Sequence, residues 1–143
     1  MSNGTKSYKG KMLGRPRTRF NELKTIPTRC PEHMYLYLKG LYPRRWASLT
    51  AMYDDMLKQF VNERPWEHGL KWKKPQTTLV RVGGQENRTG WIQVNIQVDI
   101  GLAKSVEKIA HMQDPRVSMA MFAYTAIFWW IQYEFPPQAP EKK

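Results

Sequence analysis

The sequence predicts a mainly α-helical fold that carries a short antiparallel β-ribbon, built from two copies of one strand–helix–helix unit. Residues 92–99 alternate strictly between apolar and polar side chains, which is typical of a strand with one buried face. Two stretches of helical periodicity follow, separated by Asp114-Pro115. The same order of elements recurs earlier in the chain, so the two strands are expected to pair with each other in antiparallel orientation.

The clearer copy of the unit spans residues 91–135. Its strand alternates two sets of residues, Ile92, Val94, Ile96 and Val98 against Gln93, Asn95, Gln97 and Asp99. Asp99 is expected to cap the next helix, because a carboxylate accepts hydrogen bonds from the unpaired N–H groups of a first helical turn. A second helix, apolar almost all round, is expected from Ser118 to about Tyr133.

The fainter copy spans residues 25–61. A short strand over 25–30 is followed by Pro31, a residue that can open a helix. That helix is expected to stop at Pro43-Arg44-Arg45, and a second one is expected to begin at Ser48 or Thr50. A shift of 68 residues superposes the two patterns without a gap, although few of the residues are identical.

A strand that alternates polar and apolar residues, followed by two helices, resembles the ribbon-helix-helix family typified by the Arc and MetJ repressors. The resemblance covers residues 25–61 and 91–133, and two copies in one chain are similar to the tandem, TraY-like members of the family. It implies a pseudo-dimer made by one chain, in which the strands form a ribbon and the helices share a core. It also implies a transcriptional regulator that binds double-stranded DNA sequence-specifically, or an accessory factor of the relaxosome in conjugative transfer of a plasmid or other mobile element.

In that family the outward side chains of the ribbon enter the major groove. Carried over to this chain, the base-reading residues are Gln93, Asn95, Gln97, Thr25 and Arg29. An amide can form two hydrogen bonds with adenine, and a guanidinium can do the same with guanine. The alternative is an ordinary solvated strand face, which also carries amides. Since the two strands differ in sequence, the DNA target is expected to be asymmetric.

The family holds DNA phosphates at the start of its second helix, where free N–H groups attract anions. The corresponding residues of this chain are Arg116 and Ser118 in one copy, and Arg44, Arg45, Ser48 and Thr50 in the other. Simple helix capping by the hydroxyl groups is the alternative, and it is compatible with phosphate contact.

Charge also favours a polyanionic partner. The chain has 23 Lys and Arg against 12 Asp and Glu, a formal net charge of +11. Residues 1–24 carry seven of these cations and one acid, which predicts a basic, flexible arm. The arm residues expected to contact phosphates are Lys11, Arg15, Arg17 and Arg19. A basic but unselective solvated surface is the alternative interpretation.

Residues 62–90 form a basic connector, with an extra strand expected near 77–82 and a turn at Gly83-Gly84. Trp66 and Trp72 are expected to pack on the core, and stacking on single-stranded bases is the alternative. Residues 136–143 are expected to form a polar tail.

No catalytic residue, metal site or cofactor is expected, because Cys30 is alone and the three His lack the spacing of metal ligands. We therefore expect a non-enzymatic cytoplasmic protein whose partners are double-stranded DNA, further copies of the chain on adjacent sites, and transcription or relaxosome proteins. A membrane partner is not expected, since the apolar segment 117–133 is shorter than the roughly 20 residues of a spanning helix. An adaptor that does not bind DNA and uses this segment is the alternative function.

Overall fold

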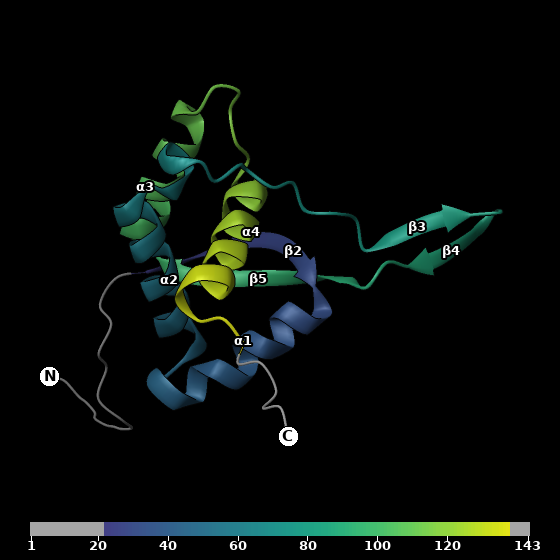
Figure 1. Cartoon of the computed structure of the whole chain (residues 1–143), viewed down its shortest axis with the longest axis horizontal. Helices are drawn as coiled ribbons and strands as arrows, with labels where there is room; N and C mark the ends of the chain where they lie inside the picture. The colour runs from purple at the N-terminus through teal and green to yellow at the C-terminus, as the bar shows by residue number, and fades with distance from the viewer. Residues whose placement is uncertain (1–21, 138–143) are drawn as a thin grey trace, which may run out of the picture.

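The computed structural model describes residues 22–137, and within them the chain forms four α-helices and two small sheets. The elements in chain order are β2 (Leu23–Pro31), α1 (Glu32–Arg45), α2 (Leu49–Glu63), the 3-10 turn η1 (Pro65–His68), β3 (Leu79–Val82), β4 (Gln85–Arg88), β5 (Trp91–Asp99), α3 (Ile100–Met112), α4 (Met119–Trp129) and the π-helical turn η2 (Trp130–Glu134) (Figure 1).

Strands β2 and β5 pair in antiparallel along their whole length, from Leu23 opposite Asp99 to Pro31 opposite Trp91. The pairing expected between residues 25–30 and 92–98 is therefore confirmed. Pro27, at the middle of β2, lacks an N–H donor but is tolerated, because every strand of a two-stranded sheet is an edge strand. On each strand, every second side chain points to the same face of the sheet. The side chains on the buried face are Ile26, Thr28, Cys30, Val94, Ile96 and Val98.

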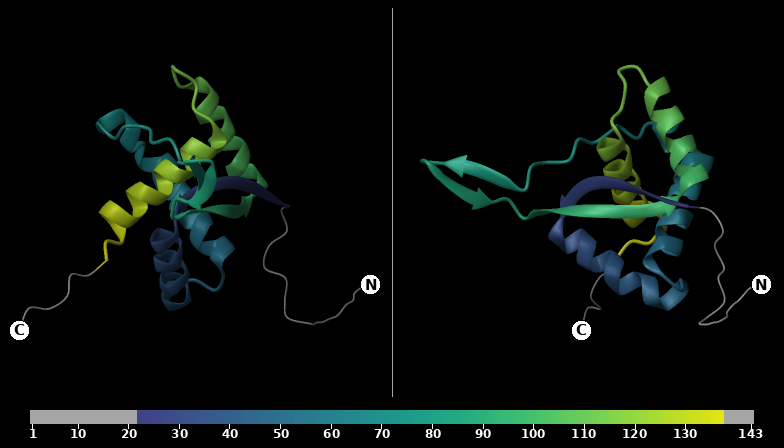
Figure 2. Two further views of the ribbon diagram at one scale, coloured as in Figure 1. Left: turned by 90° about the vertical axis from the view of Figure 1, so that its right-hand side faces the viewer. Right: turned by 180° about the vertical axis from the view of Figure 1, so that it is seen from behind.

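The helices cover this buried face. Helix α4 packs mainly against β2 and helix α2 against β5. Figure 1 shows α4 in front of the sheet, and the view from behind in Figure 2 shows the sheet in front of α4. The Thr28 hydroxyl donates to the Ala120 carbonyl at 2.7 Å, so the polar group on the inner face of β2 is satisfied. The opposite face of the sheet remains exposed to solvent.

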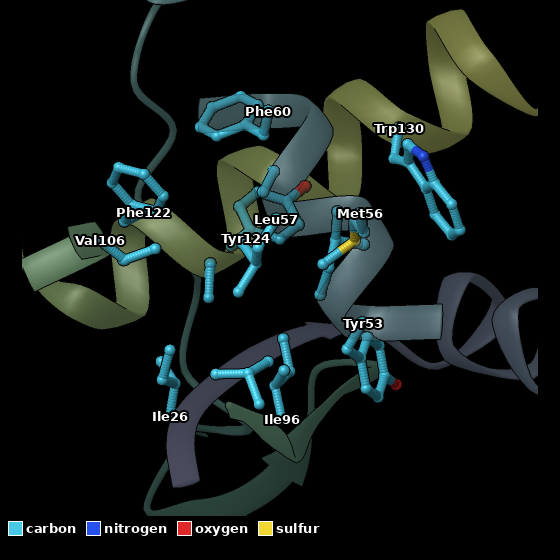
Figure 3. Close-up of a cluster of buried hydrophobic side chains, with 14 of the residues drawn as sticks. Ile26, Tyr53, Met56, Leu57, Phe60, Ile96, Val106, Phe122, Tyr124 and Trp130 are labelled. Carbon is cyan, nitrogen blue, oxygen red and sulfur yellow. The ribbon is translucent and has the colours of Figure 1, made fainter. Parts of the chain in front are cut away.

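Aromatic rings fill the core between α2, α4 and the segment after α2 (Figure 3). The Phe60 ring is fully buried, and the rings around it lie at 5.1–6.0 Å between centroids: Trp66, Trp72, Phe122 and Trp129. Trp66 and Trp72 also stack on each other at 5.2 Å. The expectation that these two rings pack on the core is confirmed, and the connector is thereby fixed to the domain.

The connector also forms a second sheet, which corrects the predicted fold class. Strands β3 and β4 pair only with each other, through a turn in which Gly83 and Gly84 have φ values of 59° and 82°. Positive φ at both central residues is the requirement of a type I′ turn, one of the two favoured two-residue hairpin turns, and glycine meets it without strain. The predicted class, mainly α with one short antiparallel ribbon from two ribbon-helix-helix units as a pseudo-dimer, is therefore wrong: the strands of residues 22–137 are divided between two separate sheets.

Three predicted helix caps are right, with Ser48 rather than Thr50 at the start of α2, and one predicted helix end is wrong. Asp99 caps α3, Ser48 caps α2 and Ser118 caps α4, each by accepting hydrogen bonds from N–H groups in the following turn. Pro43, however, lies inside α1, which continues to Arg45. Proline removes one donor from the helical ladder, but this close to the C-terminus the helix loses little, and the Trp46 N–H still bonds to Tyr42.

Helix α4 is apolar on nearly every side because the domain surrounds it, and its residues from Phe122 to Ile127 are all buried. Within residues 22–137, no helix combines the length and the apolar character needed to cross a membrane. The apolar segment noted in the sequence is therefore a core helix of this domain.

The sheet provides a matched test of its two faces. Ile96 is fully buried, so Ile96→Ala is expected to lower the free energy of unfolding by about 2–5 kcal/mol. Its exposed neighbour Asn95 contributes little packing, so Asn95→Ala should change the same quantity by less than about 0.5 kcal/mol. Chemical denaturation measures both, and equal losses would contradict the assignment of the faces.

Burial of Cys30 predicts an unreactive thiol. Desolvation raises the pKa of Cys30 from 9.0 to about 11, so the reactive thiolate is scarce in the folded protein. An aromatic disulfide reagent at about pH 8 is expected to modify Cys30 only after unfolding. Since the thiol ionises at lower pH in the unfolded chain, its contribution to stability is present below pH 9.0 and is lost as the pH rises towards 11. Rapid modification of the native protein would contradict this burial.

Candidate nucleic-acid interface

All five candidate base-reading residues lie on the exposed face of the β2–β5 sheet. The register places Thr25 opposite Gln97 and Arg29 opposite Gln93, with Pro27 opposite Asn95 between them. Thr25 and the three amides are exposed, whereas Arg29 is half-buried. The Gln93 amide lies 3.4 Å from the Asn95 side-chain oxygen, so neighbouring amides on this face contact each other. The structure thus brings together residues that are about 70 positions apart in the chain.

This face offers hydrogen-bond donors and acceptors on a rigid support. Each outward residue alternates with a buried one, so the core holds the backbone beneath it. The Asp99 N–H also donates to the buried carboxylate of Asp54 on α2 at 3.0 Å, which joins the end of β5 to the helix layer. Arg29 adds a cation whose Nε is buried and has no hydrogen-bond partner in the described part of the chain. Such a face can contact an extended ligand rich in acceptors and donors.

Two grooves border the sheet. The groove beside β5 has a volume of about 370 Å³, and it brings Tyr35, Thr50 and Tyr53 next to Gln93, Asn95 and Gln97. Its counterpart beside β2 has a volume of about 300 Å³ and contains Lys24, Thr25, Lys104 and Met119. One border therefore offers hydroxyl groups and the other offers two lysines, together with Glu107.

The two serines predicted to contact phosphates, Ser48 and Ser118, cap helices α2 and α4. The Ser48 oxygen accepts from the Ala51 N–H at 3.1 Å, and the Ser118 oxygen accepts from the Met121 N–H at the same distance. Each hydroxyl still has its own proton to donate. Thr50 follows in the first turn of α2 and lines the groove beside β5. Arg116 is exposed and precedes the cap of α4 by two residues. Both helix starts can therefore hold an anion near the sheet.

Arg44 and Arg45 lie elsewhere. They form the last turn of α1, where the helix dipole attracts cations, and do not lie in the first turn of α2. The Arg45 guanidinium lies 5.1 Å from the centroid of the Phe135 ring, so this side chain is already in contact with the C-terminal segment. The other phosphate candidates, Lys11, Arg15, Arg17 and Arg19, lie outside the described residues.

Sequence reasoning missed four residues that border the sheet: Tyr35, Tyr53, Lys24 and Lys104. Tyr35 and Tyr53 resemble core residues in the helical pattern, and burial does raise the pKa of Tyr53 above its ordinary value. Their position beside the amides follows from the packing of α1 and α2 on β5. Lys24 could have been recognised in the sequence as a residue bordering the polar face, because it directly precedes Thr25 in the chain.

No protein-family model, no curated protein and no solved structure matches the chain. Any function assigned to this chain therefore rests on its own residues and their arrangement.

Removal of either serine cap is expected to destabilise the protein. Ser48→Ala and Ser118→Ala each leave an N–H group of the first turn without its side-chain acceptor, at a cost of about 0.5–2 kcal/mol. Ser105→Ala is the matched control, because Ser105 is exposed within α3, where alanine is the better helix former. Thermal or chemical unfolding compares the three variants, and a loss for Ser105→Ala as large as for the caps would contradict the capping role.

Proposed function

We propose that this protein binds double-stranded DNA sequence-specifically, as a transcriptional regulator, with the exposed face of the β2–β5 sheet in the major groove. One observation carries the proposal: an uncovered two-stranded sheet presents Gln93, Asn95 and Gln97 on one strand and Thr25 and Arg29 on the other. These side-chain types are the ones that recognise base edges through paired hydrogen bonds.

Dimensions support a duplex as the ligand. Two paired strands lie about 4.8 Å apart, and a major groove about 12 Å wide accepts such a ribbon together with its side chains. The helices on the inner face keep the sheet in place, so little ordering is required when the outer face binds. The net charge of +11 supplies the attraction to phosphate that most DNA-binding proteins use.

The borders of the sheet supply candidates for backbone contact. The start of α2 reaches the groove beside β5, and the start of α4 reaches the groove beside β2. Residues at these helix starts and the lysines near β2 line the two grooves that border the sheet, one on each side. Phosphate contacts of this kind position the protein and leave the choice of sequence to the strand side chains.

The two strands have different chemistry, which predicts an asymmetric target. The β5 strand presents three amides, which suit adenine. The β2 strand presents a hydroxyl, a proline and, towards one end, a guanidinium that suits guanine. A site recognised by this sheet should therefore differ between its two halves.

The sequence is also compatible with two other functions. The adaptor hypothesis needs an available apolar surface on segment 117–133, but α4 uses that surface within its own domain core. A role as an accessory factor in conjugative transfer uses the same DNA interface as transcriptional regulation. Genome-wide occupancy distinguishes these two roles: binding at promoters supports the regulator, and binding confined to an origin of transfer contradicts it.

The proposal predicts that Asn95→Ala weakens specific binding alone. Loss of one bidentate base contact is expected to cost about 1–3 kcal/mol, roughly 5- to 150-fold in Kd, on the preferred site. Binding to random duplex should change little, since phosphate contacts remain. Asn62→Ala is the matched control, because Asn62 is an exposed amide on α2.

The measurement is a titration of each variant on the preferred site, selected from random duplexes, and on an unrelated duplex. Equal losses on both DNAs for Asn95→Ala would show that this face does not read bases. Absence of any preferred site would contradict the proposed function itself.

A further inference from the structure

The hairpin β3–β4 projects from the domain and lies beyond the end of the β2–β5 sheet (Figures 1 and 2). Every residue from 79 to 88 is exposed, and the two strands pair only with each other. Leu79, Val80 and Val82 are 47%, 46% and 61% exposed, so this strand leaves three large aliphatic side chains in water. A two-stranded hairpin is only marginally stable alone, which makes an uncovered one unusual unless it contacts a partner.

The base of the hairpin is attached firmly to the proposed DNA interface. The Thr89 N–H donates to the Thr78 carbonyl at 3.1 Å, and the Thr89 hydroxyl donates to the Thr77 carbonyl at 2.6 Å. The same hydroxyl oxygen accepts from the Trp91 N–H at 3.2 Å, at the first residue of β5. Only Thr89 and Gly90 separate β4 from β5, so the hairpin continues from the end of the sheet.

The chain leading into the hairpin is held in the same way. The Lys73 N–H donates to the Thr125 hydroxyl of α4 at 2.9 Å, and the Lys73 ammonium lies 4.3 Å from the centre of the Phe128 ring. These contacts fix where the connector leaves the core. The connector is therefore anchored to α4 six residues before the hairpin begins at Leu79.

Charge identifies the kind of partner. Residues 70–90 carry one acid, Glu86, and five cations, Lys71, Lys73, Lys74, Arg81 and Arg88. Arg81 and Arg88 lie on the same face of the hairpin, opposite Glu86 and Leu79 respectively. The Arg81–Glu86 ion pair is long, at 3.7 Å, and both side chains are largely exposed. Arg88 forms no ion pair within residues 22–137. A polyanion that continues past the end of the sheet would meet Arg81 and Arg88, whereas Lys71 and Lys73 line a groove beside α4.

We propose that hairpin β3–β4 is a second DNA-contacting element, which follows the phosphate backbone beyond the end of the sheet where β5 begins. This inference rests on the proposed function. Four strand residues span about 13 Å, the length of about 4 base pairs, so the hairpin extends the protected DNA by about that length on one side. Its contacts are with phosphates, and the choice of sequence stays with the β2–β5 sheet.

Deletion of the hairpin tests its position. A variant in which Gly-Ser-Gly-Ser replaces residues 79–88 keeps Thr78 and Thr89, which are already hydrogen-bonded to each other. On the preferred site, hydroxyl-radical footprinting of the full chain should show protection that the variant loses over about 4 base pairs on one side only. An unchanged footprint, or loss on both sides, would overturn the inference.

Point variants test the chemistry without removing backbone. The double variant Arg81→Ala/Arg88→Ala should reduce the slope of log K against log salt by about 2, because each phosphate contact contributes about 0.9. The matched control Gln85→Ala/Asn87→Ala changes the other face of the same hairpin and should leave the slope unaltered. Equal slopes for both double variants would overturn the role in phosphate contact.

Failure of this inference and failure of the proposed function give different results. If the full chain protects no DNA and selects no site, the proposed function fails and the inference fails with it. If the full chain protects a site and the hairpin variants protect the same base pairs with the same salt slope, only the inference fails. If the hairpin instead contacts a second copy of the chain, its removal would leave the single-site footprint intact and abolish cooperative binding to adjacent sites. That result would also overturn the inference.

Discussion

The antiparallel pairing of β2 with β5 is the constraint on which the rest of this structure depends. It joins residues 23–31 to residues 91–99, so the chain between them, including two helices and a hairpin, must leave and return to the same sheet. The sheet has one apolar face, and the helices gather on that face because it is the surface that must be removed from water. The other face is left outside as a direct consequence.

Polar contacts under the sheet make this arrangement specific. A core of aliphatic and aromatic side chains alone tolerates small shifts of a helix along a strand. The bond from Thr28 to Ala120 fixes α4 against β2, and the bond from Asp99 to Asp54 fixes α2 against the end of β5. A shift of either helix would break one of these hydrogen bonds to a buried group, which costs about 1–3 kcal/mol. The outer face therefore has a defined geometry before any ligand binds.

The two sheets of the described residues differ in their support, and this suits them to different tasks. The β2–β5 sheet is backed by four helices, so its side chains keep their relative positions and can recognise a pattern. The β3–β4 hairpin has support only at its base, so it suits contacts that need charge and reach more than exact placement. In the function proposed above, the β2–β5 sheet selects the DNA sequence and the hairpin adds contact with the backbone.

Local patterns in the sequence determined much of this protein. The alternation at 92–98 predicted a half-buried strand, the Asp and Ser caps marked the starts of three helices, and the five candidate base-reading residues do share one exposed face. These features depend on residues close together in the chain, whose periodicity and capping chemistry can be recognised directly from the amino-acid sequence. The antiparallel pairing of the two strands was also predicted, since the two segments share the same order of following elements.

Tertiary structure alone decided the rest. The Gly83-Gly84 turn was visible in the sequence, but the exposed strand Gln85–Arg88 has no apolar alternation, and only its pairing with β3 makes it a strand. The end of α1 lies beyond Pro43, and so Arg44 and Arg45 belong to that helix and not to the start of α2. Tyr35 and Tyr53 border the amides because α1 and α2 pack on β5. Each of these features depends on contacts between segments far apart in the chain, and such contacts leave no periodic signal in the sequence around either partner.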